Sequence, residues 1–491
     1  MRIYLLRAGV AVLVLGLFTG GTAIAQVQEL ASGKIPITTA SVEARNLFLQ
    51  GQNLTDRIRA TDARQYYLQA VELDPGFAYA WWALAVAAPT AREFFESLEH
   101  ALASVDNASD AERMLILATD AAVRGDPAAQ REQLTQLVEA YPGDERAHVA
   151  LGNFYYGRQE WESAIEQYTM ATEINPDFSP PYNTMGYANR FLGDYDEAER
   201  AFERYIKLIP DEPNPYDSYA ELLMKMGRFE ESIANYEKAL THDANFVASY
   251  VGIGNNQMFM GRGDDARATF RKLSEEIART DGERRAGLLW TAVSYLHEAD
   301  YEAAIEQVRA MYKIAEENGD GAQMSGDLNL IADILLHSGD PQQALTEFQR
   351  SVETMEGADV PDEVKEATRR NHLYDAVRVA LMSDDLATAR TETEAYGEQV
   401  RMHNIPFEVR QHHELLGMIA LHEEDYETAI AEFAQANRQD PQVLLMSAKA
   451  HQNAGHDEEA RALLEQAANF NQLNFNYAYV RAKAQKMLSE M

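Results

Sequence analysis

Apolar residues recur at three- and four-residue steps along nearly all of the chain, and short polar pairs of the Gly-Asp type interrupt them. Leu151 and Tyr155 lie four residues apart on one segment, and Ala164 and Tyr168 lie four residues apart on the next. That spacing places apolar side chains on one face of a helix, and polar pairs containing glycine are typical of turns. The pattern therefore predicts a succession of paired amphipathic helices.

The predicted helix pairs repeat every 34 residues through the middle of the chain. A small residue is expected where two helices cross closely, because a large side chain would push their axes apart. A proline suits the end of a unit, since it cannot continue a helix but can begin the next one. Matching positions in two neighbouring units are Gly152 and Gly186, Ala164 and Ala198, Tyr168 and Phe202, and Pro176 and Pro210.

This pattern resembles the tetratricopeptide repeat (TPR) family, whose signature is large-x-x-Leu-Gly-x-x-Tyr followed by Ala, Phe, Ala and Pro. The unit starting at Glu145 fits seven of these eight positions, with His148 as the departure, and the unit starting at Arg410 fits six. The resemblance implies an all-α fold, a right-handed superhelical solenoid of about twelve helical hairpins with a C-terminal capping helix. The units start near residues 44, 78, 111, 145, 179, 213, 247, 285, 325, 370, 410 and 441.

The spacing of the units suggests how the chain is organised. It is regular in the first part and irregular later, where we expect longer second helices and longer connecting loops. The last residues place Tyr477 and Val480 on one face and Arg481 mostly on the other, as a capping helix requires. The expected segments are a signal peptide (1–25), an extended lead-in (26–43), a regular TPR array (44–284), a less regular TPR-like array (285–473) and the capping helix (474–491).

The first 25 residues have the layout of a secretory signal peptide. Arg2 and Arg7 are positive, residues 8–18 form an uninterrupted run of 11 apolar or glycine residues, and a small-x-small site ends at Ala25. An uncleaved membrane anchor is disfavoured, because crossing a bilayer takes roughly 20 apolar residues. We expect a periplasmic or secreted protein that is not inserted in a membrane after cleavage.

Composition and charge exclude several classes of function. The chain has no Cys, which excludes disulfides, thiol catalysis and thiolate metal sites. Its formal net charge of −35 disfavours binding to nucleic acid, since no basic surplus is available to displace counterions from phosphates. No recognised catalytic or nucleotide-binding motif is present. The expectation is a protein that is not an enzyme and has no cofactor and no metal.

The residues of one loop are also compatible with a calcium site. Glu316, Asn318, Asp320, Gly321 and Asp327 fall at positions 1, 3, 5, 6 and 12 of a calcium-loop pattern. Position 1 is normally Asp and position 12 Glu, and here the two are exchanged. A polar loop between repeats explains the same residues.

The resemblance also implies a binding surface, because in this family the first helices of successive units line a concave groove. Asn side chains there could hold an extended peptide backbone, and aromatic and Met side chains could supply adaptable apolar contacts. Trp82 and Tyr374 take inward places in the second and tenth units. The candidate groove residues of the middle units are Arg146, Asn153, Tyr156, Asn183, Tyr187, Arg190, Asn214, Asp217, Asn255, Met258 and Phe259.

These features favour an exported, non-enzymatic scaffold or adaptor that binds a protein or peptide in its groove, in a setting such as cell-envelope assembly. The acidic charge favours a partner with a basic or mixed surface. Two alternatives stay open. One is a carrier of polysaccharide or a small ligand in the groove, and the other is an enzyme with an unrecognised site in the second half.

The signal peptide prediction can be checked by mass spectrometry of the exported protein. Cleavage after Ala25 should give a mature chain whose first residue is Gln26. Mature material that still begins at Met1, or protein confined to the cytosol, would contradict it.

Overall fold

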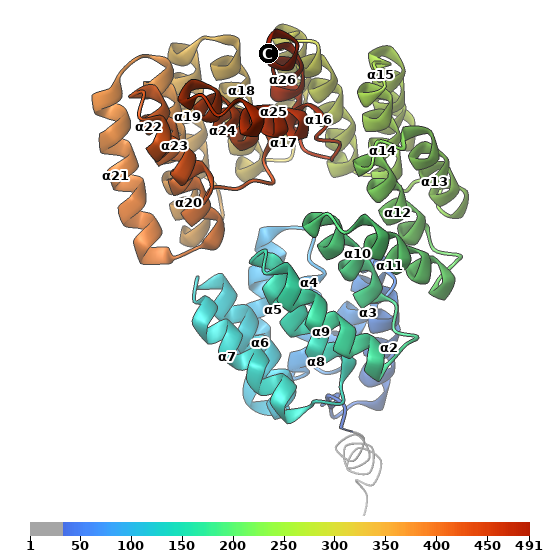
Figure 1. Ribbon diagram of the computed structural model, residues 1–491. Coiled ribbons are helices and arrows are strands. Elements are labelled where there is room, and N and C mark those ends of the chain that lie inside the picture. Colours follow the sequence, from blue (N-terminus) through green and yellow to red (C-terminus); the bar gives the residue numbers. More distant parts are fainter. Residues whose placement is uncertain (1–32) are drawn as a thin grey trace, which may run out of the picture.

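The computed structural model describes residues 33–491, and this part of the chain is helical throughout, with 25 α-helices and no strand (Figure 1). The predicted signal peptide lies outside the described residues. Successive helices pair into twelve hairpins, and a single helix follows them, so the expected all-α solenoid is confirmed. The first six hairpins are α2 (Val42–Thr55) with α3 (Ala60–Leu73), α4 (Ala78–Val86) with α5 (Ala91–Ala103), α6 (Asp110–Val123) with α7 (Pro127–Ala140), α8 (Glu145–Gly157) with α9 (Trp161–Ile174), α10 (Pro180–Leu192) with α11 (Tyr195–Leu208), and α12 (Pro213–Lys225) with α13 (Phe229–His242).

The later hairpins contain longer helices, up to the 21 residues of α20, and close with α26. Longer second helices were expected in these later units, and the structure shows that the residues beyond the regular repeat length lengthen first helices as well. These elements are α14 (Val247–Phe259) with α15 (Gly263–Lys272), α16 (Asp281–His297) with α17 (Tyr301–Glu317), α18 (Gly321–Ser338) with α19 (Pro341–Glu356), α20 (Asp362–Met382) with α21 (Leu386–His403), α22 (Pro406–His422) with α23 (Tyr426–Phe433), α24 (Pro441–Ala454) with α25 (Asp457–Ala468), and α26 (Tyr477–Glu490). One turn of 3₁₀-helix (Val105–Asn107) and one of π-helix (Leu273–Ile277) lie between elements.

Eight of the twelve described hairpins are held by a small residue on the first helix that faces an aromatic side chain 16 positions later on the second helix. At Gly152, an added Cβ would lie 2.5 Å from Cε1 of Tyr168, and at Gly51 it would lie 2.6 Å from Cε1 of Tyr67. Both aromatic side chains are buried. The same small–aromatic crossing occurs at Gly186 and Phe202, Ala220 and Tyr236, Gly254 and Phe270, Ala332 and Phe348, Ala380 and Tyr396, and Gly417 and Phe433.

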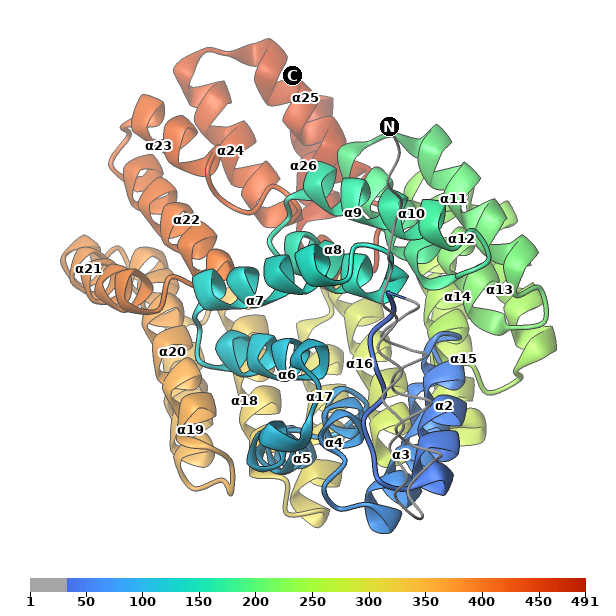
Figure 2. The same ribbon diagram turned by 90° about the horizontal axis from the view of Figure 1, so that it is seen from below.

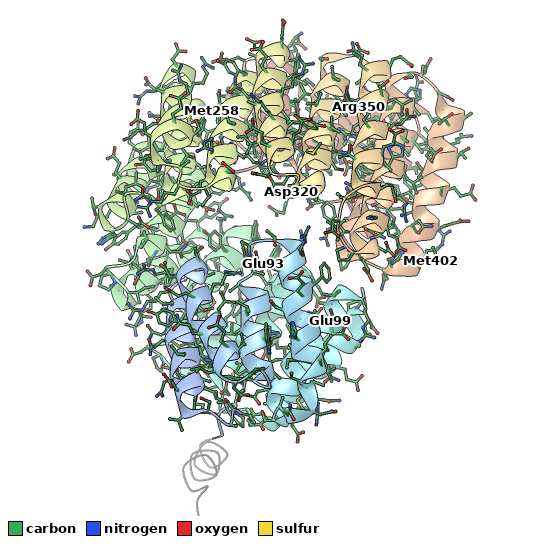
Figure 3. All side chains as sticks on the ribbon, turned by 180° about the vertical axis from the view of Figure 1, so that it is seen from behind. Glu93, Glu99, Met258, Asp320, Arg350 and Met402 are labelled. Atoms are coloured by element: carbon green, nitrogen blue, oxygen red, sulfur yellow. The ribbon has the colours of Figure 1, made fainter. Side chains whose placement is uncertain are left out.

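The solenoid curls into an N-terminal and a C-terminal half, joined through α10 to α15 (Figure 1). In the N-terminal half, Arg57 after α2 reaches Glu212 before α12, at 3.2 Å between Nη1 and Oε1. The halves also meet away from this junction. Arg92 pairs with Asp359 at 2.9 Å, and Gly125 lies beside the backbone of His403, where α7 approaches α22 (Figure 2). Seen from behind, Glu93 and Asp320 lie on the sides of the halves that face each other (Figure 3).

The described part of the lead-in, residues 33–41, is extended and lies against the N-terminal ends of α6 and α8 and the C-terminal end of α3. The N–H of Ile35 donates to Asp144 at 2.8 Å, and the N–H of Thr38 donates to Glu112 at 2.7 Å. The N–H of Ala40 donates to Asp74 at 3.0 Å. These bonds tie the lead-in to units one, three and four.

The small–aromatic crossing predicts a local and steric defect for Gly152→Leu. The side chain must displace the Tyr168 ring from a buried crossing, and overpacking of this kind costs about 1–3 kcal/mol. Hydrogen exchange should rise in α7 to α11, because each unit contacts mainly its neighbours.

Gly157→Leu is the matched control on the same helix, because no atom lies within 4 Å of an added Cβ there. Equal effects of the two substitutions, or uniform loosening of all units by Gly152→Leu, would contradict the role given to the crossing.

Candidate binding groove

The first helices of the hairpins line the inner face of the solenoid, and this face is open in the N-terminal half. A cavity of about 450 Å³ lies there, bordered mainly by α2, α4, α6 and α8. Cavities of about 300–1,000 Å³ lined mostly by apolar side chains are typical of binding sites. The apolar lining includes Phe48, Tyr79, Trp82, Val86, Leu115, Leu134, Phe154 and Phe178.

The cavity wall is built around stacked aromatic rings. The rings of Tyr79 and Trp82 stack at 5.4 Å between centroids, and Phe48 packs on the other side of Tyr79 at 4.8 Å. The indole Nε1 of Trp82 donates to Thr119 at 2.8 Å, which fixes the orientation of the ring. At the rim, Val86 is 55% exposed and so is available to a ligand.

The charged groups of the cavity are already paired. Arg146 donates from both terminal nitrogens to the Asp56 carboxylate, at 2.8 and 2.6 Å, and its guanidinium covers the Phe178 ring at 4.8 Å. This bidentate pair joins unit four to the end of α2 and offers no free charge. The uncharged polar groups that line the cavity include Gln52, Thr119, Gln130 and Asn153. The cavity can therefore accommodate an apolar or aromatic group of a ligand, and the polar side chains around it can form hydrogen bonds with the rest of that ligand.

Two of the predicted groove residues, Arg146 and Asn153, line this cavity. Asn153 is exposed and accepts a hydrogen bond from the hydroxyl of Tyr168 at 2.8 Å. Tyr156 lies just beyond, packed on Trp161 at 5.1 Å between ring centroids.

The predicted groove residues of α10 and α12 lie in the next part of the inner face and include several buried polar groups. Arg190 is buried and pairs with Glu221 at 3.1 Å, and its guanidinium covers the Tyr187 ring at 4.8 Å. Asn183 is also buried, and its Oδ1 has no hydrogen-bond partner among the described residues. At the start of α12, Asn214 accepts from Tyr205 at 3.0 Å.

The carboxyl group of Asp217 has a strongly raised pKa. It is buried and accepts a hydrogen bond from Ser249 at 2.8 Å. Burial, together with the negative charge of Glu221, raises the pKa of Asp217 to about 8, against the smaller opposing effect of the Ser249 bond. The carboxyl group is therefore mostly protonated at neutral pH.

The last three predicted groove residues belong to α14 and are covered by the protein itself. Asn255 is fully buried and donates to the carbonyl of Val251 at 2.9 Å. Met258 and Phe259 are 1% and 8% exposed, because Tyr477 of α26 lies on them. A partner could reach these two residues only if α26 moved away.

A second polar cluster lies on the inner face of the C-terminal half, beside a cavity of about 260 Å³. Arg378 pairs with Asp333 at 2.5 Å and Asp375 at 3.3 Å. Burial raises the pKa of Asp375 to about 6 and that of Glu414 to about 7. Asp440 belongs to the same cluster and caps α24 through the N–H of Gln442 at 2.8 Å. The cluster thus joins α18, α20, α22 and α24.

Tyr374, the inward residue of the tenth unit, lies within the same cluster and donates to Glu414 at 3.1 Å. The geometry does not favour the calcium alternative. Glu316 lies within α17, and the carboxylate of Asp327 receives both terminal nitrogens of Arg285 at 2.8 and 2.9 Å. Within residues 33–491, no group of three acidic or His side chains is arranged to hold a metal.

Family models of the tetratricopeptide repeat match residues 117–177, 179–212, 214–246 and 420–484. The chain contains tetratricopeptide repeats. Proteins built of TPR units typically act as protein-interaction scaffolds. Within residues 33–491, no helix is both long and apolar enough to cross a membrane.

The TPR chain is similar to parts of longer proteins. It is 26% identical to Cellulose synthase operon protein C of Xanthomonas axonopodis over 69% of this chain and 23% of that protein. It is 31% identical to Protein O-mannosyl-transferase Tmtc1 of Drosophila melanogaster over 23% of this chain and 14% of that protein. The chain thus spans less than a quarter of the length of either relative.

Two solved structures are also similar to this chain. A tetratricopeptide repeat protein from Parabacteroides merdae is 15% identical, with 54% of this chain and 99% of that chain covered and a TM-score of 0.38. The Cut9–Hcn1 hetero-tetramer of APC/C contains a chain that is 14% identical, with 86% and 76% covered and a TM-score of 0.40.

The groove predicted from the sequence lies on units four to seven, whereas units one to three build much of the cavity in the structure. Trp82 was the one residue there assigned to an inward place. Phe48 and Tyr79 carried no distinguishing signal, because aromatic residues at such places also serve as core. The Asp56–Arg146 pair joins residues 90 positions apart and had no local signal.

The buried carboxyl of Asp217 predicts a pH dependence of stability. Its pKa is raised in the folded state, so its contribution is present at low pH and is lost as the pH rises through about 8. Between pH 6 and pH 9 the wild-type chain should lose about 1–3 kcal/mol of unfolding free energy through this group. The Asp217→Asn chain should keep this part of its unfolding free energy over the same pH range. Urea unfolding at both pH values measures the difference.

Glu203→Gln on the neighbouring α11 is the control, because Glu203 is exposed. Equal pH dependence of the wild-type and Asp217→Asn chains would show that Asp217 is ionised in the folded protein.

Proposed function

We propose that this protein is a non-enzymatic TPR scaffold that binds a protein or peptide partner on the inner face of its N-terminal half. The observation that carries the proposal is the open, aromatic-lined cavity of about 450 Å³ beside Trp82. The inner face of units seven to nine is covered by α26, and the cavity of the N-terminal half is larger than the polar cavity of about 260 Å³ in the C-terminal half.

The partner should present an apolar or aromatic side chain to this cavity. The charges of Arg146 and Asp56 neutralise each other, so the cavity has no unpaired charge to hold an ionic group. The amide groups of Asn153, Gln52 and Gln130 could bind the backbone next to that anchor. The net charge of −35 favours a partner whose surrounding surface is basic or mixed.

We also propose that the protein acts outside the cytoplasm, in a periplasm or as a secreted protein. Arg2, Arg7 and the apolar run of residues 8–18 support this setting. A role in assembling or maintaining the cell envelope is consistent with it.

Site-specific photo-crosslinking tests the proposed surface in the native envelope. A photo-reactive residue at Val86, on the cavity rim, should capture a partner. The same residue at Met170, which is 40% exposed on the second helix α9, is the control and should not capture it. Capture from Met170 alone would place the partner on the outer face and contradict the proposal.

The affinity of the captured partner gives a second prediction. Val86→Lys should weaken binding at least tenfold, about 1.4 kcal/mol, because it puts a charge into the apolar cavity. The helix itself should tolerate the change, since Val86 is exposed and a cation suits a helix C-terminus. Met170→Lys should change the affinity less than twofold. Calorimetry measures both, and equal losses would contradict the assignment.

A carrier of polysaccharide is the second candidate, because stacked Tyr79 and Trp82 rings among amide side chains also suit a sugar. Binding to a glycan array that is lost in Val86→Lys, with no protein captured from position 86, would favour the carrier.

A further inference from the structure

The terminal helix α26 does more than end the array, because it lies on the inner face of units seven to nine (Figure 1). Tyr477, its first residue, is fully buried. The Tyr477 hydroxyl lies 3.5 Å from the sulfur of Met258, and its ring packs at 4.8 Å on Phe259 and at 5.6 Å on His297. One aromatic side chain of α26 thus enters a pocket formed by α14 and α16.

The contacts extend on both sides of this pocket. Tyr479 stacks on His337 of α18, with 3.7 Å between ring centroids. Phe470, which precedes α26, lies under the ammonium group of Lys225 of α12 at 4.3 Å. The C-terminal segment therefore covers first helices from four successive units, on the face where a TPR protein would receive a partner.

This interface leaves polar groups poorly satisfied. Arg481 of α26 is 8% exposed and makes no ion pair with any described residue; its one hydrogen bond is to Asn471 at 3.0 Å. Its guanidinium lies over the Phe259 ring at 4.8 Å. In addition, Nδ1 of His297 and Oε1 of Gln472 are buried and have no hydrogen-bond partner within residues 33–491. Burial and the nearby Arg481 charge both lower the pKa of His297.

Such groups reduce the net stability gained when α26 docks. Buried polar groups in a permanent core are almost always hydrogen-bonded, and a buried cation is normally paired. The hairpin crossings bury aromatic rings against glycine or alanine, and the hydroxyls of Tyr67, Tyr168 and Tyr396 are hydrogen-bonded there. The hydroxyl of Tyr236 is the exception among these crossings, since it is buried with no partner among the described residues. Residues 469–476 form the connection between the last hairpin and α26. Another helix with better-matched polar groups could therefore replace it.

We propose that the inner face of α14, α16 and α18 is a second binding surface, which α26 occupies in the free protein and which an amphipathic helix of a partner protein takes over. This surface is separate from the N-terminal cavity and does not depend on the function proposed for it.

The side chains on the inner face of α14, α16 and α18 define the chemistry of the partner helix. It carries an aromatic side chain that enters the pocket of Met258, Phe259 and His297, as Tyr477 does. Where α26 places the unpaired Arg481, the partner carries an acidic side chain, which would pair with His297 in its protonated form. The remaining face of the partner helix is polar, as the exposed side of α26 is.

Hydrogen exchange of the wild-type full-length chain tests whether α26 detaches from the inner face of α14, α16 and α18. Amides of α26 should exchange at least tenfold faster than those of α14 and α16, because α26 opens without unfolding the hairpins. Exchange of all three helices at one common rate would show that α26 is a permanent part of the core and would overturn the proposal.

A labelled peptide of residues 474–491 tests whether the surface accepts a helix from outside. It should bind the full-length Tyr477→Ala chain, whose own α26 has lost its anchor, at least tenfold more tightly than the wild-type chain. Adding Phe259→Ala to that chain should abolish the binding. A peptide with Arg481→Glu should bind more tightly than the native peptide, and one with Lys486→Ala, whose side chain is 75% exposed, should bind equally well.

Equal binding to the wild-type and Tyr477→Ala chains, or binding that survives Phe259→Ala, would overturn the proposal. A concentration-dependent dimer of the wild-type chain that the peptide dissolves would also overturn it, because the surface would then belong to α26 of a second copy. If Tyr477→Ala fails to fold, the exchange rates of the wild-type chain decide the question.

Discussion

The close crossing of the two helices within each hairpin is the constraint on which the rest of this molecule depends. A glycine or alanine on the first helix lets an aromatic ring of the second helix lie directly on the backbone, as Tyr168 does at Gly152. This fixes the distance and angle between the helices of a unit. Since each unit then stacks on the next in nearly the same way, the geometry of one crossing propagates into the curvature of the array.

The curvature of the array gives the solenoid an inner and an outer surface, although the contacts that produce it are local. Because the solenoid curls tightly, groups far apart in sequence meet on its inner face, as Arg146 and Asp56 do in the N-terminal half. The two halves use this face differently. The N-terminal half leaves a cavity with aromatic walls, whereas α26 covers the inner face of units seven to nine in the C-terminal half.

Burial of carboxyl groups follows from the same curvature in a strongly acidic chain. Asp217, Asp375 and Glu414 point to the inner face, where neighbouring first helices remove them from water. Burial raises the pKa of each, so these groups are more protonated than free carboxyl groups at the same pH. The inner face is therefore less negative than the net charge of the whole chain suggests, which suits a surface that receives apolar side chains.

Local patterns in the sequence determined the helical hairpins and their order. Glycine, aromatic and proline residues spaced 34 positions apart each act within one unit or on the next one, so their effect can be deduced without knowing the fold. For the same reason, Arg146 and Asn153 could be assigned to the inward side of a first helix, and both do line the cavity.

The tertiary structure alone decided what the inner face contains. Arg481 was expected mostly on the exposed side of a capping helix, and it is buried because α26 packs on units seven to nine as well as on the last hairpin. The place of Tyr477 on Met258 depends on the summed rotation of all the units between them. Small differences at each stacking contact accumulate over that distance, so no short pattern in the sequence encodes where distant units meet.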